Sequence, residues 1–205
     1  MRYDTAYRDV ITQNMARFVA TPMESGGLKR AAVGLIVTDD GEGGAALVLT
    51  RRATKLNSHS GQWALPGGRL EDGESPAQAA LREAREEINL ELSGDTILGV
   101  LDDYPTRSGY LITPVVAWAP AGATMSPNPA EVARIHLMAL TVFNRPGSPE
   151  FVSIPESDRP VVRYPVTDQY IHAPTAAVLY QFMEVAVHGR PTRVSHLEQP
   201  VWAWR

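Results

Sequence analysis

The sequence of 205 residues contains no cysteine, no long apolar run and no excess of positive charge. Without cysteine, disulfide bonds, thiolate metal ligands and a cysteine nucleophile are all excluded. No apolar stretch reaches the roughly 18 residues that a membrane-spanning helix requires, so we expect no membrane association. Lysine and arginine number 19 against 23 acidic residues, which gives a net charge of −4. That balance argues against nucleic-acid binding, because no basic surface is available to neutralise backbone phosphates.

The two ends of the chain carry no recognisable targeting signal. Residues 1–18 contain acidic side chains and lack the apolar core of a secretory signal, and the final Ala-Trp-Arg differs from a peroxisomal signal. We therefore expect a cytoplasmic protein. Its length and its 44% content of hydrophobic residues suit a single domain over residues 1–205.

Hydrophobic spacing predicts a mixed order of helices and strands along the chain. We expect one amphipathic helix at about residues 4–19 and another at about 175–187, ended by Gly189. Predicted strands cover residues 30–37, 45–52, 90–101, 110–118 and 135–140. Pro114 predicts an edge position or a bulge for its strand. A proline-rich loop is predicted over residues 145–160, and the whole order is typical of an α/β protein.

A further helix is predicted to begin near residue 76. Ser75 is a natural N-cap, Pro76 suits the first helical position, and Gln78 completes a capping box with Ser75. Small apolar residues at helical spacing give this helix a face for close packing.

The same helix carries a high density of acidic residues. Glu83, Glu86 and Glu87 are spaced so that we expect all three to project from one face. Like charges at such spacings cost an isolated helix roughly 0.2–0.5 kcal/mol per pair. One interpretation is a solvated charged face relieved by Arg82 and Arg85. The other is a site for a hard divalent cation, since a glycine-rich turn precedes the helix and such ions bind oxygen ligands and bridge to phosphates.

Residues 68–90 resemble the Nudix box of the Nudix hydrolases. The match consists of Gly68, Glu74 after five intervening residues, and the run 82–90 after seven more. Ala84 is smaller than the aliphatic residue usual in the box, which affects only packing. Asn89 replaces a glycine at the helix end, where asparagine is the next best residue for a left-handed cap.

The resemblance implies the fold and the chemistry of the acidic helix. The expected fold is a Nudix-type α/β/α sandwich around a mixed β-sheet. By the same resemblance, Mg²⁺ or Mn²⁺ is the cofactor, Glu86 and Glu87 are its most direct ligands, and Glu83 is the third. Arg82 is expected to orient the glutamates, with Glu74 as its partner.

Upstream of the box, residues 48–68 resemble an additional motif of the coenzyme A diphosphatase branch of the family. The matching residues are Leu49, Thr50, Arg52, Ala53, Gly61, Pro66, Gly67 and Gly68. Asn57 replaces a second arginine of the motif, which removes one cation that could hold an anionic substrate, and Leu65 replaces a phenylalanine.

Several groups near this motif are candidates for binding substrate. They are Arg51, Arg52, Lys55, His59, Gly67 and Gly68. The two arginines could instead simply end a strand, and the histidine could be a solvated loop residue.

Two carboxylates are candidates for the base that activates water. Glu86 is one candidate, and Glu131, which the resemblance implies to lie on a loop near the metal, is the other. Glu131 could alternatively be an acid in the first turn of a short helix, where its negative charge would interact favourably with the helix dipole.

The resemblance implies metal-dependent hydrolysis of a diphosphate linkage in a small nucleotide substrate. Coenzyme A or acyl-coenzyme A is the expected substrate, giving 3′,5′-ADP and a phosphopantetheine. Alternatives are a general pyrophosphatase acting on ADP-ribose, NADH or dinucleoside polyphosphates, and a non-catalytic nucleotide-sensing protein. The C-terminal tail holds two of the four tryptophans and could form a terminal strand or contact a second subunit, so a homodimer is possible.

Overall fold

The structure is a computed structural model that describes residues 1–53, 61–167 and 169–204. Its helices are α1 (Thr5–Arg17), α2 (Pro76–Ile88), α3 (Leu140–Phe143) and α4 (Thr175–Phe182). Its strands are β1 (Lys29–Asp39), β2 (Ala45–Arg52), β3 (Trp63–Ala64), β4 (Gly67–Arg69), β5 (Ile97–Val100), β6 (Tyr104–Pro105), β7 (Tyr110–Trp118), β8 (Val132–Ala139), β9 (Glu150–Ile154), β10 (Ser157–Val166) and β11 (Gln169–His172). Short 3₁₀ turns occur at Gly94–Thr96 and Val201–Trp204.

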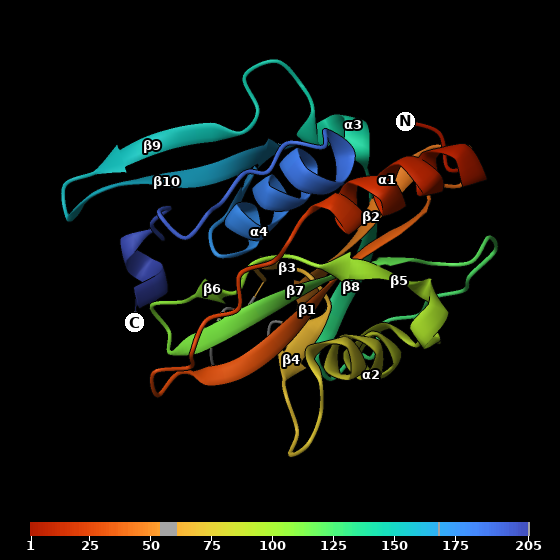
Figure 1. The fold of residues 1–205 in the computed structure, drawn as a ribbon, viewed down its shortest axis with the longest axis horizontal. Helices are drawn as coiled ribbons and strands as arrows, with labels where there is room; N and C mark the ends of the chain where they lie inside the picture. The colour runs from red at the N-terminus through yellow and green to blue at the C-terminus, as the bar shows by residue number, and fades with distance from the viewer. Residues whose placement is uncertain (54–60, 168, 205) are drawn as a thin grey trace.

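One large mixed sheet lies at the centre of the molecule (Figure 1). Its strands follow the order β3-β2-β1-β7-β5, and β8, β4 and β6 pair with β2, β1 and β7. The pair β1 and β7 is parallel, whereas the other pairs are antiparallel. A second sheet, of order β11-β10-β9, lies beside α4. The predicted α/β class with a mixed sheet is confirmed.

Helices cover both faces of the large sheet, with α2 on one side and α1 and α4 on the other (Figure 1). The central strands are therefore buried on both faces. In β1, Leu35 and Val37 belong to the core under α1 and α4, whereas Ile36 between them belongs to the core under α2. This alternation follows from the two-residue period of a strand.

The strands β1 and β2 form a fork that later holds the candidate site. They pair only next to their connecting turn, from Val37 opposite Leu47 to Asp39 opposite Ala45. Beyond that point they separate, and β3 then pairs with β2 while β4 pairs with β1. The Gly34 N–H donates to Pro66 O at 2.8 Å, so the segment between β3 and β4 fills the fork.

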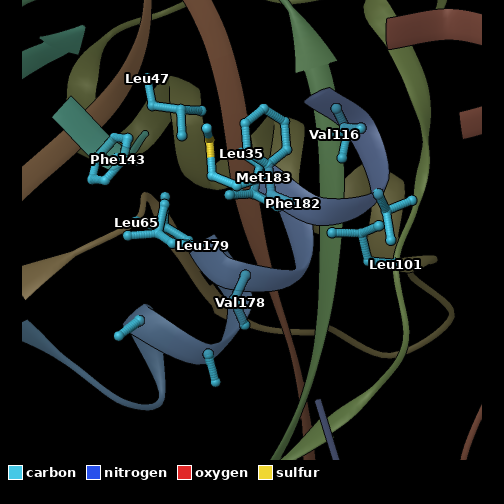
Figure 2. Close-up of a cluster of buried hydrophobic side chains, with 14 of the residues drawn as sticks. Leu35, Leu47, Leu65, Leu101, Val116, Phe143, Val178, Leu179, Phe182 and Met183 are labelled. Atoms are coloured by element: carbon cyan, nitrogen blue, oxygen red, sulfur yellow. The ribbon is translucent and has the colours of Figure 1, made fainter. Parts of the chain in front are cut away.

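The larger core is built around α4. Figure 2 shows Phe182 and Met183 packed among Leu35, Leu47 and Val116, which come from β1, β2 and β7. The predicted helix at 175–187 is confirmed, with its last turn, Met183–Val187, wound as a π-helix. It ends where predicted, since Gly189 has φ 68° and its N–H donates to Val185 O. The predicted N-terminal helix is also present, as α1.

The prediction that Pro114 marks an edge or a bulge is wrong for the edge, whereas the pairing of β7 is irregular opposite Pro114, as the bulge alternative predicts. The strand β7 lies inside the sheet, between β1 and β5. Pro114 O accepts a hydrogen bond from the Leu101 N–H at 2.9 Å. On this side of β7, the pairing with β5 ends at Val115 and the pairing with β6 begins at Ile112. An extended residue directs its N–H and C=O toward the same neighbour, so the missing N–H of Pro114 falls where β6 gives way to β5.

Two other segments differ from their predictions. Residues 145–160 are not a loop, because β9 and the start of β10 form a hairpin there. The prolines avoid the ladder: Pro149 precedes β9, Pro155 lies in the turn, and Pro160 lies at a shift in register of β10. The strand predicted at 90–101 is confined to β5.

The C-terminal tail is tied to the fold through a buried carboxylate. Glu198 accepts from Arg107 Nε at 3.1 Å, Arg107 Nη2 at 2.6 Å and Ser157 Oγ at 3.2 Å. Only 1% of its side chain is exposed. After it the tail forms the 3₁₀ turn Val201–Trp204 rather than the terminal strand that was one alternative. Contact with a second subunit stays a prediction.

Within the described residues, no helix combines the length and apolar character needed to cross a bilayer.

Replacing Phe182 by alanine is expected to lower the free energy of unfolding by about 3–5 kcal/mol, because this fully buried ring would leave a cavity. Denaturant unfolding measures the change. The control is Phe151→Ala on β9, whose side chain is 48% exposed and which should cost less than about 1 kcal/mol. Equal losses in the two variants would contradict the described core.

The Glu198 carboxylate predicts a specific acid sensitivity. Hydrogen bonding to Arg107 lowers the pKa of Glu198 to about 2, against about 4.5 for an unperturbed glutamate. Its stabilising effect of about 3 kcal/mol is therefore complete above pH 4.5 and is lost as the pH falls toward 2. Unfolding free energies of the wild type and Glu198→Gln should differ most above pH 4.5 and converge toward pH 2. Parallel curves over that range would refute this assignment.

Candidate active site

A cavity of about 850 Å³ opens at the fork between β1 and β2. Its wall contains Glu83 and Glu87 of α2, Arg52 at the end of β2, the turn at Gly67 and Gly68, and Glu131. The sheet thus brings together residues from four separate parts of the sequence. The volume lies within the range of sites for small molecules, roughly 300–1,000 Å³.

The turn into β4 requires glycine because two other groups approach its backbone closely. A Cβ on Gly67 would lie 2.3 Å from Ala32 O, and one on Gly68 would lie 2.1 Å from Glu83 Oε1. Both distances are shorter than any normal contact. The Gly67 N–H also donates to Glu87 Oε2 at 3.3 Å. Gly67 therefore allows β4 to lie close to β1, and Gly68 allows Glu83 of α2 to lie directly against β4.

The guanidinium group of Arg82 organises the acidic residues. It donates to both carboxylate oxygens of Glu74 at 2.9 and 3.0 Å, and to Arg69 O at 2.9 Å. Its Nη1 donates to Glu83 Oε1 at 2.8 Å and to Glu86 Oε2 at 3.0 Å. Because a guanidinium has five N–H donors, every one of them has a partner here. The expected pairing of Arg82 with Glu74 is present in the structure.

The three predicted metal ligands lie within an arc of about 100° on α2, but they differ in exposure. Glu83 and Glu87 are buried, at 9% and 4% exposure, and line the cavity. The Glu86 side chain is 53% exposed and is not part of the cavity wall. Adjacent helix residues are about 100° apart, so Glu86 and Glu87 cannot point the same way. Glu83 and Glu86 nevertheless lie close together, because both bind Arg82 Nη1.

Burial disfavours the charged forms of the cavity carboxylates. It raises the pKa of Glu87 to about 8, and the charge of Glu83 adds to the effect. Burial also raises the pKa of Glu83, against the opposing hydrogen bond from Arg82. Two buried carboxylates that repel each other are stabilised by a neighbouring positive charge.

This donor set fits a hard divalent cation. Glu83 and Glu87 offer only oxygen atoms, which are the ligands that Mg²⁺ and Mn²⁺ prefer. In the part of the chain that the structure describes, no three His, Asp or Glu side chains are already converged as a metal cluster. The assignment of a divalent cation to Glu83 and Glu87 therefore rests on two points. Their ligand atoms are oxygens, and burying both carboxylates without a positive charge is unfavourable.

Glu131 reaches the cavity from a turn tied to α2. The Asn128 N–H donates to Glu87 O at 2.8 Å, and Asn128 Nδ2 donates to Glu86 O at 3.2 Å. Asn128 O in turn accepts from the Glu131 N–H at 3.0 Å. The alternative in which Glu131 begins a short helix is wrong, because the turn leads directly into β8.

The four predicted basic residues are placed differently. Arg52 lines the cavity, where its charge opposes the raised pKa of Glu87. Arg51 points elsewhere: its guanidinium lies over the ring of Trp63 at 4.3 Å and donates to Gly61 O at 2.6 Å. Lys55 and His59 lie outside the described residues.

The cavity also contains residues that sequence reasoning missed. Arg69 donates through Nε and Nη2 to the Tyr110 hydroxyl at 3.1 and 2.6 Å. Thr175, at the start of α4, also lines the wall. Arg69 directly follows the glycine turn, so its position was a usable signal. Tyr110 carries no motif, whereas Thr175 lies in the segment 172–177, which resembles a helix start common in the coenzyme A diphosphatase branch.

The predicted cap at the end of α2 is present. Asn89 has φ 51° and ψ 33°, which is the left-handed conformation expected for the residue that replaces glycine. Its side chain also donates to Ser126 O at 2.9 Å. The substitution therefore preserves the helix end that carries the acidic residues.

Comparison with known proteins agrees with this geometry. The model of the NUDIX domain family matches residues 28–154, which is more than half of the chain. A protein of Photorhabdus laumondii named "Uncharacterized Nudix hydrolase NudL" is 44% identical over 96 residues, which cover 46% of this chain and 51% of that protein. A protein of the same name from Yersinia pestis is 44% identical over 88 residues, covering 42% of this chain and 44% of its own. The chain thus matches about half the length of these relatives.

Two solved structures share the fold. The crystal structure of the Nudix hydrolase RenU from M. smegmatis has a TM-score of 0.51 and 22% identity, covering 82% of this chain and 90% of that one. A NUDIX hydrolase from Nitrosomonas europaea has a TM-score of 0.50 and 18% identity, covering 81% of this chain and 76% of its own. The match of the family model, together with this fold, shows that the chain belongs to the Nudix domain family.

Proposed function

We propose that the protein is a divalent-metal-dependent hydrolase that cleaves a diphosphate linkage in a nucleoside diphosphate derivative. The observation that carries the proposal is the pair of buried carboxylates, Glu83 and Glu87, in the wall of a cavity large enough for a nucleotide. Membership of the Nudix family and the complete set of box carboxylates support the same reaction.

Glu83, Glu86 and Glu87 would hold Mg²⁺ or Mn²⁺. When bound, the ion offsets the charge of the diphosphate oxygens and lowers the pKa of the attacking water. Glu83 and Glu87 face the cavity, and Glu86 lies beside Glu83 through their shared partner Arg82. Gly68 leaves room for the Glu83 carboxylate, because a Cβ at this position would lie 2.1 Å from Glu83 Oε1.

Arg82 positions the carboxylates and does not contact substrate. All five of its N–H groups are already hydrogen-bonded, so none is left for a phosphate oxygen. Its bidentate bond to Glu74 fixes the plane of the guanidinium, and that plane directs Nη1 at Glu83 and Glu86.

We assign the role of general base to Glu131 in preference to Glu86. Glu131 lines the cavity, and its charge adds to the raised pKa of both Glu83 and Glu87, which places it near them. Glu86 is more exposed and is bonded to Arg82. Asn128 holds the Glu131 turn against the end of α2, through hydrogen bonds to Glu86 O and Glu87 O.

Coenzyme A or an acyl derivative is the proposed substrate, with 3′,5′-ADP and a phosphopantetheine as products. The support is the motif at residues 48–68, whose Arg52 lines the cavity beside the carboxylates. A cation in this position can bind a phosphate oxygen.

A substrate panel with Mg²⁺ or Mn²⁺ tests the proposal, with products resolved by chromatography. We expect coenzyme A to be cleaved with a higher kcat/KM than ADP-ribose, NADH or dinucleoside polyphosphates. Preference for one of these others would move the protein to the general pyrophosphatase alternative. If no diphosphate is cleaved with either metal but nucleotides still bind, the sensing alternative holds.

The matched variants for this panel are Glu87→Gln and Glu91→Gln. Glu87→Gln keeps the shape of the side chain but removes a metal-binding charge, so we expect kcat to fall by at least about a hundredfold. Glu91, just beyond α2, has a side chain that is 84% exposed, and its replacement should leave kcat unchanged. Full activity of Glu87→Gln would exclude the proposed metal site.

Replacement of Arg82 by lysine is expected to lower kcat or the Mn²⁺ affinity about 10- to 100-fold, because lysine cannot bind Glu74 bidentately while holding Glu83 and Glu86. Steady-state kinetics and calorimetric Mn²⁺ titration measure the two quantities. Arg85→Lys on the same helix is the control, since the Arg85 side chain is 73% exposed and makes only a 3.8 Å ion pair with Glu91. Indistinguishable behaviour of the two variants would remove Arg82 from its assigned role.

A further inference from the structure

A second, smaller cavity of about 190 Å³ lies next to the proposed active site. The two cavities have wall residues in common, namely Gln62, Trp63, Pro174, Thr175 and Ala203. The two cavities therefore adjoin each other along this wall.

The small cavity has an unusually aromatic wall. It contains Trp63 of β3, Tyr170 and His172 of β11, and Trp202 of the C-terminal turn. The ring of His172 lies 5.9 Å from Tyr170 and meets Trp202 edge-on at 5.3 Å. Trp202 is 47% exposed, so much of its surface is available for contact. We call this group of four rings the aromatic pocket.

A cation borders the aromatic pocket. Arg51 lines it, with its guanidinium stacked over Trp63. Arg51 and Arg52 are adjacent in sequence but line different cavities, so Arg51 has no role in the proposed active site. A guanidinium beside aromatic rings favours flat π-systems and the anionic groups attached to them.

Most of the aromatic pocket is made by a part of the chain outside the family match. Tyr170, His172 and Trp202 all follow residue 154, where the match ends. The second sheet and the tail thus add a wall that the Nudix domain itself does not supply.

We propose that the aromatic pocket binds the nucleobase of the nucleotide substrate. The proposal rests on the proposed function and adds the position of the base. A base stacks on aromatic side chains through its π-face, whereas a pantetheine chain has no such face. The volume suits a ring system rather than a whole nucleotide, and the shared wall lets the phosphates lie at the carboxylates of α2.

Binding of AMP and of ribose 5-phosphate, which lacks the base, tests the proposal without any turnover. Calorimetry on the full chain should show that AMP binds at least tenfold more tightly than ribose 5-phosphate. Trp202→Ala should weaken AMP binding about tenfold, which is about 1.4 kcal/mol, and leave ribose 5-phosphate unchanged. Trp202→Phe should retain most of the AMP affinity, because phenylalanine still offers a ring.

The controls separate stacking from a structural role. Tyr170→Leu is the second variant, in case Trp202→Ala unfolds the tail, and it should also weaken AMP selectively. Phe151→Ala is the matched control, since this exposed aromatic residue of β9 lines neither cavity. Equal affinity of AMP and ribose 5-phosphate would overturn the proposal. An equal loss of affinity for both ligands in Trp202→Ala would also overturn it. The same holds if Trp202→Ala changes only the oligomeric state of the protein.

Kinetics with the cleaved substrate provide a second readout. Trp202→Ala should raise KM about tenfold and change kcat less than twofold, because the base is bound away from the reacting phosphate. If AMP binding follows the expected pattern but no diphosphate is hydrolysed, the aromatic pocket stands and the proposed function fails. If hydrolysis occurs but Trp202→Ala has wild-type AMP affinity and KM, only the aromatic pocket fails.

Discussion

The hydrogen bonds of one guanidinium group hold the acidic centre of this protein together. Arg82 has five N–H donors, and each meets an oxygen of Glu74, Glu83, Glu86 or the β4 backbone. The side chains of Arg82 and Glu74 are only 21% and 12% exposed, so solvent screens this ion pair less than it screens a pair on the surface. The arrangement lets several carboxylates lie near one another before any metal ion binds.

The fork between β1 and β2 is what makes room for that centre. The strands separate after three paired residues, and the segment with Gly67 and Gly68 enters between them. Because Gly68 lacks a side chain, α2 approaches the sheet closely enough for Glu83 to be buried against β4. Buried carboxylates without a counter-charge are unfavourable, as the raised pKa of Glu87 shows, and this same cost favours a cation.

The C-terminal part of the chain contributes to the walls of both cavities. Thr175 begins α4 and contributes to both cavities, and the tail is anchored nearby by the buried bond between Glu198 and Arg107. The stability of the tail and the proposed binding of the base therefore depend on connected parts of the structure. The proposed metal ligands and base come from the matched domain, whereas the proposed contacts to the nucleobase come mostly from beyond it.

The sequence by itself determined the features that depend on neighbouring residues. The capping box at Ser75 and the left-handed cap at Asn89 were predictable, because each involves groups at one end of a helix. The pairing of Arg82 with Glu74 was implied by the resemblance of this segment to the Nudix box. Tertiary structure alone decided the position of Pro114 inside the sheet and the strands within residues 145–160. It also brought Trp63 and Trp202 to one pocket. Such contacts join residues far apart in the chain, and their geometry depends on how whole strands and helices pack, which no local spacing rule encodes.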